Sequence, residues 1–195
     1  EKIKSVCVKH GLQLHLDGAR LFNALVTKKE TTLQYGATFN TISICLSKGL
    51  GTPVGSVLLG PAAFIKKARR VRKVFGGGMR QAGFLAAAGI YALKNNVERL
   101  ATDHLHANEI AAALAKKDFV GTILDVETNI IIFEIKGRLT ATEFVSVMKE
   151  DKTHGLRFVV KVNNICWKST SSKNISTKYK LEETKKFLKV IQSQY

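Results

Sequence analysis

Two segments of the sequence end in a charged side chain that could take part in chemistry. Residues 12–17 alternate apolar and polar types up to Asp17, and an apolar run ending at Leu46 is soon followed by Lys48. A glycine comes directly after each charged residue. Each segment therefore predicts a β-strand whose carboxyl end carries one charged group, and such strand ends are where open α/β sheets bind ligands.

A carboxylate and an amine at one sheet edge are the pair that pyridoxal 5'-phosphate (PLP) requires. The Lys48 amine would form a Schiff base with the cofactor aldehyde, while the Asp17 carboxylate would face the pyridinium nitrogen. The spacing alone is more typical of solvated surface charges than of a cofactor site. Asp17 could also cap a helix that opens in residues 18–21. The residues around Asp17 and Lys48 distinguish between these interpretations.

Three ordered segments resemble the low-specificity threonine aldolases, which are PLP-dependent enzymes of fold type I. Residues 15–24 read HLDGARLFNA and resemble the family's aspartate segment. Residues 47–56 read SKGLGTPVGS and are similar to its cofactor-lysine segment. Residues 72–83 read RKVFGGGMRQAG and resemble the block that follows in the family. The resemblance is weaker from about residue 150 onward.

The resemblance implies an α/β chain of fold type I, the aspartate aminotransferase-like fold. We expect the C-terminal half of its large PLP-binding domain in residues 1–100 and its small C-terminal α+β domain in residues 101–195. The alternation of strand and helix after residue 100 is typical of a small α+β domain.

Local patterns predict the elements that would hold these segments. Strands are expected at residues 12–17, 37–46, 54–59, 126–135 and 156–162. Helices are expected from Pro61 to the glycines at 76–78, as one or two over 83–117, from the capping box Thr140-x-x-Glu143 to about Met148, and over 181–192.

The resemblance also implies roles for basic residues. Arg20 corresponds to an arginine that helps hold the substrate carboxylate, a task suited to a planar guanidinium. Lys73 and Arg80 match basic residues near the cofactor phosphate, with the arginine reaching across the subunit boundary. Arg20 could instead form a salt bridge with Asp17, and the other two could simply belong to a basic helix face and a turn.

The chain departs from the family pattern in two respects. A C-terminal arginine that binds the substrate carboxylate aligns best with Lys168, which supplies charge without the bidentate fork; Arg157 is a second candidate. The sequence begins just before the aspartate strand and without a methionine, so the family's glycine-threonine phosphate loop and its stacking histidine are not in it. We therefore expect a fragment or a degenerate copy with little or no activity alone.

Other potential ligands and nucleophiles are expected to be structural. His15 lies on the same strand face as Asp17 and is expected to be a hydrogen-bonded core histidine. Cys45 is expected to be an inert buried thiol. His104 and His106 are two residues apart on a predicted helix and point to different faces, so no metal site is expected.

The implied reaction is a retro-aldol cleavage of L-threonine or L-allo-threonine to glycine and acetaldehyde, carried out by a homodimer or homotetramer of dimers. The preferred diastereomer does not follow from the sequence. Another fold-type I reaction, such as transamination or β-elimination, remains an alternative, as does a non-catalytic remnant.

The composition of the 195-residue chain limits its possible partners and its cellular location. Its net charge of +16 would suit a basic binding module, but the lysines are scattered and no stacking motif accompanies them, so no nucleic-acid partner is expected. No apolar run could span a bilayer, and no signal-peptide core is present, so no membrane partner is expected. Three widely spaced cysteines favour a reducing, cytoplasmic location.

Overall fold

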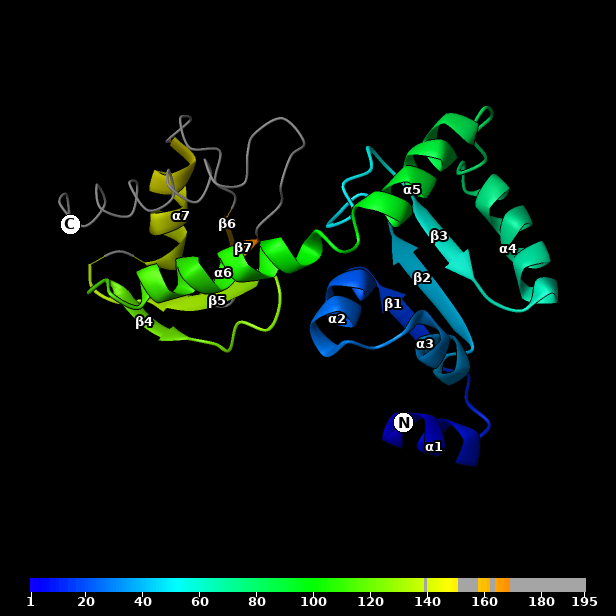
Figure 1. Ribbon diagram of the computed structural model, residues 1–195, viewed down its shortest axis with the longest axis horizontal. Coiled ribbons are helices and arrows are strands. Elements are labelled where there is room, and N and C mark those ends of the chain that lie inside the picture. Colours follow the sequence, from blue (N-terminus) through cyan, green and yellow to red (C-terminus); the bar gives the residue numbers. More distant parts are fainter. Residues whose placement is uncertain (139, 151–157, 162–163, 169–195) are drawn as a thin grey trace. The chain divides into compact units, whose positions relative to one another are not determined.

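The computed structural model describes residues 1–138, 140–150, 158–161 and 164–168 (Figure 1). The chain divides into two compact units, Glu1–Arg99 and Leu100–Tyr195. The strand expected at 156–162 is described from Phe158 to Lys161. The helix expected over 181–192 and the second carboxylate-binding candidate, Arg157, lie outside the described residues.

The first unit is built on a three-stranded sheet in the order β1-β2-β3. Strand β1 runs parallel to β2, whereas β3 runs antiparallel to β2, and Figure 1 shows the arrows of β2 and β3 pointing in opposite directions. In chain order the elements are α1 (Lys2–Lys9), β1 (His15–Gly18), α2 (Leu21–Lys28), α3 (Thr32–Thr38), β2 (Thr41–Cys45), β3 (Ser56–Leu59), α4 (Ala62–Val74) and α5 (Gly83–Asn95).

The three strands expected in this unit are present but shorter than the sequence pattern suggested. The largest difference is at residues 37–38, which were expected to open a strand and instead close helix α3. Thr31 caps that helix: its hydroxyl accepts a hydrogen bond from the Gln34 amide, and the Gln34 side chain accepts one from the Thr31 amide. This capping box starts a helix although threonine and glycine have low helix propensity.

Two apolar clusters fix this sheet to its helices. Leu21 and Leu25 of α2 pack with Ile42 of β2, all three being buried. Leu46, directly after β2, packs with Leu50 and with Ala92 of α5. Since β1 and α2 are joined by only two residues, the first cluster also fixes where the end of β1 lies.

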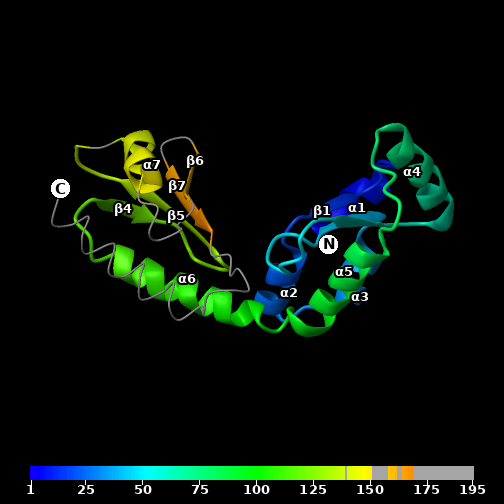
Figure 2. The same ribbon diagram turned by 90° about the horizontal axis from the view of Figure 1, so that it is seen from above.

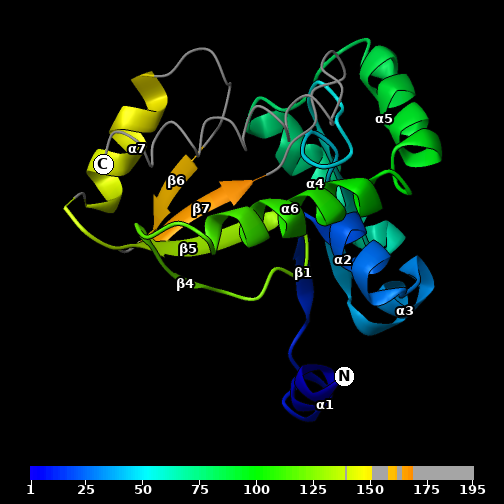
Figure 3. The same cartoon turned by 60° about the vertical axis from the view of Figure 1, so that its left-hand side comes forward.

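The second unit contains a four-stranded antiparallel sheet in the order β4-β5-β7-β6. Its elements are α6 (Leu100–Leu114), β4 (Val120–Ile123), β5 (Ile130–Ile135), α7 (Ala141–Glu150), β6 (Phe158–Lys161) and β7 (Asn164–Lys168). Figure 3 shows β7 lying between β5 and β6. The helical pattern over 83–117 is thus two helices, α5 and α6, and β4 is a strand that the sequence did not predict.

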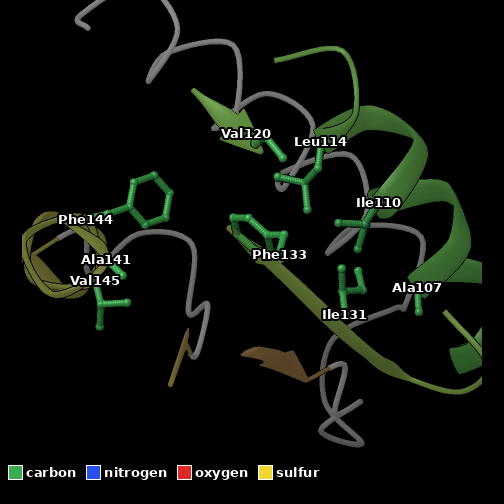
Figure 4. Packing of buried hydrophobic residues seen from close by; sticks show 9 residues of the cluster. All are labelled: Ala107, Ile110, Leu114, Val120, Ile131, Phe133, Ala141, Phe144 and Val145. Atoms are coloured by element: carbon green, nitrogen blue, oxygen red, sulfur yellow. The ribbon is translucent and has the colours of Figure 1, made fainter. Parts of the chain in front are cut away.

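Helices α6 and α7 share one apolar core with β5. Phe133 of β5 lies between the two helices in Figure 4 and packs edge-on against Phe144, with ring centroids 6.5 Å apart. The core also contains Ala107, Ile110, Leu114, Val120, Ile131, Ala141 and Val145. The expected capping box at the start of α7 is present, because the Thr140 hydroxyl accepts from the Glu143 amide and the Glu143 carboxylate accepts from the Thr140 amide.

His104 is buried on α6, and burial lowers the pKa of its imidazole while neighbouring Asp103 opposes that shift. Within the described ranges, no three histidine, cysteine, aspartate or glutamate side chains gather as a metal ion would require. In the same part of the chain, no helix is both long enough and apolar enough to cross a bilayer.

Candidate active site

Asp17 lies at the carboxyl end of β1, one residue before the strand ends. Its register partner across the parallel ladder is Ser43 of β2, and its side chain is exposed. The next residue, Gly18, is buried so closely against β2 that a Cβ there would lie 2.6 Å from the Ser43 carbonyl oxygen. A glycine is therefore needed beside Asp17, because any larger residue would push the two strands apart.

Lys48 lies in a tight turn that follows β2. The strand ends at Cys45, and the amide of Gly51 donates to the Lys48 carbonyl at 3.0 Å, which closes the turn. Gly51 has φ +74°, a conformation that favours glycine. The Lys48 side chain is exposed. Because β1 and β2 are parallel and in register, the turn and Asp17 lie at the same edge of the sheet.

Arg20 lies two residues beyond β1 and is the N-cap residue of α2. Its side chain is half-buried. The alternative in which Asp17 caps this helix is excluded, since Asp17 belongs to β1 and the helix begins only at Leu21. The end of the sheet thus brings together Asp17, Arg20 and the Lys48 turn.

Lys73 and Arg80 belong to the connection between α4 and α5, which Figure 2 shows as separate helices joined by a loop. Lys73 lies in the last turn of α4, which ends as expected at the glycines: Gly76 has φ +80° and its amide donates to the Lys73 carbonyl. Arg80 lies four residues after Gly76, in the loop before α5. Both side chains are exposed.

Lys168 is the last residue of β7 in the second unit, where its register partner is Ile130 of β5. It therefore belongs to a different unit from Asp17 and Lys48. Its role stays a prediction from the sequence.

Two expectations about neighbouring residues were wrong. His15 is exposed rather than in the core, and its Nδ1 hydrogen-bonds the Thr41 hydroxyl at 2.8 Å. It starts β1, where the sheet face is not covered. Cys45 is only partly buried, with its Sγ 3.7 Å from the Ser47 hydroxyl, because it lies at the open end of β2. The buried thiol in this unit is Cys7.

Two further residues contact the lysine turn, and the sequence pattern did not single them out. Asn96, directly after α5, donates from its side-chain amide to the Leu50 carbonyl at 2.7 Å. Arg99 donates from its guanidinium to the Gly49 carbonyl at 3.2 Å. These contacts join residues about fifty positions apart in the sequence, and no local pattern signals them.

The fold is that of the fold-type I PLP-dependent enzymes, as expected. The chain is similar to a solved threonine aldolase of Leishmania major, with a TM-score of 0.68 at 20% identity over 98% of this chain and 54% of that one. It is also similar to an Exiguobacterium protein assigned to the aromatic amino acid beta-eliminating lyases/threonine aldolases, with a TM-score of 0.72 at 22% identity over 95% of this chain and 55% of that one.

The family model described as Beta-eliminating lyase matches residues 1–137, and the chain belongs to this family. It is 51% identical over 131 residues to the low specificity L-threonine aldolase of Escherichia coli K12, covering 65% of this chain and 38% of the relative. It is 42% identical over 154 residues to low-specificity L-threonine aldolase 1 of Arabidopsis thaliana, covering 77% and 43%. The chain thus spans about two fifths of the length of these relatives.

Proposed function

We propose that the protein is a PLP-dependent carbon–carbon lyase that cleaves L-threonine or L-allo-threonine to glycine and acetaldehyde. The observation that carries the proposal is the parallel register of β1 and β2, which gives Asp17 and the Lys48 turn one sheet edge. The names and identities of the Escherichia coli and Arabidopsis relatives support the choice of substrate. Threonine breakdown and glycine formation would be the metabolic outcome.

The residues at this sheet edge carry the chemical groups that PLP binding requires, an amine and a carboxylate. Lys48 is an exposed amine on a glycine-containing turn, where an aldehyde can reach it. Asp17 is an exposed carboxylate on the neighbouring strand, and buried Gly18 beside it adds no side-chain bulk at that strand end. When bound, PLP would supply an electron sink for the pair released by breaking the Cα–Cβ bond. Asp17 would keep a proton on the ring nitrogen, and Lys48 would attach the cofactor covalently.

The basic residues divide into two proposed groups. Arg20, half-buried beside the end of β1, would bind the substrate carboxylate. Lys168 would add a second positive charge for the same carboxylate in the assembled protein. Lys73 and Arg80 would neutralise the cofactor phosphate, with Arg80 serving the site of a neighbouring subunit.

The cleavage requires few movements of protons and electrons. The β-hydroxyl of the substrate loses its proton and becomes the carbonyl of acetaldehyde as the Cα–Cβ bond breaks. The electron pair left at Cα is later protonated to give glycine, so no outside oxidant or reductant is needed. Arg20 would hold the carboxylate throughout, which fixes the bond to be broken relative to Lys48 and Asp17.

Assembly and location follow from the same proposal. We expect a homodimer or a homotetramer of dimers, since the proposed role of Arg80 needs a second subunit. The cytoplasm is the proposed compartment, because a reducing environment suits the free thiols of Cys7 and Cys45.

The test is product formation by the protein as its gene encodes it. Purified protein is incubated with PLP and either L-allo-threonine or L-threonine, and acetaldehyde and glycine are measured separately. We expect both products in equal amounts, with activity lost in Lys48→Ala and kept in Lys66→Ala, an exposed lysine on α4. Amino transfer to a keto acid without glycine would instead indicate a transaminase and contradict the proposal.

A further inference from the structure

The turn that begins at Lys48 is held by two side chains from the segment that follows α5, those of Asn96 and Arg99. The carbonyl groups of both central residues, Gly49 and Leu50, accept hydrogen bonds from Arg99 and Asn96 respectively. Carbonyl groups at such positions in a surface turn ordinarily face water. Fixing two successive carbonyls sets the orientation of two successive peptide planes, so the backbone that carries Lys48 has little freedom to rotate.

Asn96, the donor to Leu50, is itself held firmly. Asn96 is 7% exposed, and its amide donates to the Ala92 carbonyl at 2.8 Å, which ties the residue to the last turn of α5. Leu50 is 2% exposed and packs against Ala92, one helical turn before Asn96. If the buried side-chain amide of Asn96 lost the Leu50 carbonyl as its partner, it would carry a desolvation cost. The apolar contact of Leu50 with Ala92 and the hydrogen bond from Asn96 therefore stabilise the same position of Leu50.

The turn is also connected to the strands on its other side. The Thr52 amide donates to the Leu46 carbonyl at 3.2 Å, and the Leu46 amide donates to the Gly55 carbonyl at 3.0 Å. Thr52 is buried. The turn is therefore held at its base by the residues that adjoin β2 and β3, and at its two central carbonyls by Asn96 and Arg99, while the side chain of Lys48 is exposed.

We infer that Asn96 and Arg99 are positioning residues for Lys48, which keep its amine at the sheet edge beside Asp17. This inference rests on the proposed function, since it assigns the pair to the lysine of that site. Neither residue needs to touch cofactor or substrate. Their effect is on the geometry of the attacking amine, and a displacement on the order of 1 Å can slow a reaction roughly a hundredfold.

The test compares Asn96→Ala with Asn95→Ala. Asn95 is the matched control because its side-chain amide donates to the Tyr91 carbonyl of its own helix and lies in solvent. A second pair of variants tests Arg99. Arg99→Met removes the donor to the Gly49 carbonyl, and Arg99→Lys replaces it with another cationic donor. This pair keeps the test valid if Asn96→Ala folds poorly.

Two readouts are taken on the protein as its gene encodes it. Without cofactor, hydrogen exchange is measured at the amides of Gly51 and Thr52, which close the turn. With PLP, the rate of borohydride-trapped labelling of Lys48 is measured alongside kcat and KM.

We expect exchange at these amides to quicken about three- to tenfold in Asn96→Ala and Arg99→Met. We expect Lys48 labelling and kcat to fall roughly tenfold or more while KM changes little. Asn95→Ala should match the unaltered protein, and Arg99→Lys should recover part of the loss.

Unchanged exchange, labelling and kcat in folded Asn96→Ala and Arg99→Met would overturn the inference. If unaltered protein is not labelled at Lys48, the proposed function fails, whereas the exchange data report separately on the turn.

Discussion

Asp17 of β1 is the register partner of Ser43 of β2, and the two strands run parallel. Ser43 lies two residues before the end of β2, so both strands finish together and the turn carrying Lys48 emerges beside the end of β1. In an antiparallel pair the same two segments would end at opposite edges of the sheet. The hydrogen-bonding direction of one strand pair therefore decides whether these two charged groups can serve one site.

Asp17→Asn should separate cofactor binding from turnover. An amide keeps the shape of the carboxylate but cannot stabilise a positive charge on the ring nitrogen, so the electron sink weakens. We expect PLP still to attach at Lys48 while kcat falls by about 10² to 10³, the cost seen when one electrostatic partner of a transition state is removed. Asp125→Asn, an exposed aspartate in the second unit, is the control. Full turnover in cofactor-loaded Asp17→Asn would contradict the proposed role.

Lys73→Met and Arg80→Met should each weaken PLP binding without abolishing it. Both side chains are exposed, so each is expected to contribute modestly, raising the Kd by about two- to fivefold. The difference from unaltered protein should shrink as salt is added, because screening reduces interactions between exposed charges. Lys66→Met, on the same helix, is the control, and titration of the cofactor's absorbance is the measurement. Equal Kd values in all four proteins would remove these residues from the phosphate site.

Several elements in both units were largely predictable, because local patterns specify them. The strand before Asp17, the glycine-ended helix α4 and the capping box at Thr140 each depend on residues within a few positions of one another. The error at residues 37–38 has the same local origin. The segment 37–46 is rich in threonine and isoleucine, which favours a strand, but the capping box of Thr31 and Gln34 starts a helix that extends to Thr38.

Long-range relationships were not predictable from one sequence. Strand β4 contains glycine at position 121, which weakens a strand pattern, and it is stabilised by pairing with β5. The contact of Asn96 with Leu50 joins residues 46 positions apart, and an asparagine at a helix end ordinarily indicates only a cap. Exposure of His15 also depends on what covers the sheet, which the alternation of residues does not specify.

Thr140→Ala should destabilise the second unit. The Thr140 hydroxyl accepts from the Glu143 amide at the start of α7, and loss of such a cap costs about 1 kcal/mol of unfolding free energy. Thr142→Ala, an exposed position inside the same helix, is the control and should be close to neutral. Urea unfolding followed by circular dichroism is the measurement. Equal unfolding midpoints for the two variants would mean that the cap contributes nothing.

The same capping box should make stability depend on pH in mild acid. Hydrogen bonds from the Thr140 amide and hydroxyl lower the pKa of Glu143 below its ordinary value. A carboxyl whose folded pKa is depressed stabilises the fold above its unfolded pKa, and that contribution is lost as the pH falls through the folded value. Glu143→Gln should therefore flatten this part of the pH profile. A profile unchanged by Glu143→Gln would contradict this assignment.

The covalent attachment of PLP to Lys48 is the most direct test of the proposed site. Protein as its gene encodes it is saturated with PLP, reduced with borohydride, digested and mapped by mass spectrometry, with Lys48→Arg treated in parallel. We expect one stoichiometric label on Lys48 and none at the corresponding peptide of Lys48→Arg. An absent label, or a label that remains elsewhere while threonine cleavage persists in Lys48→Arg, would contradict the assignment of this lysine and of the site built around it.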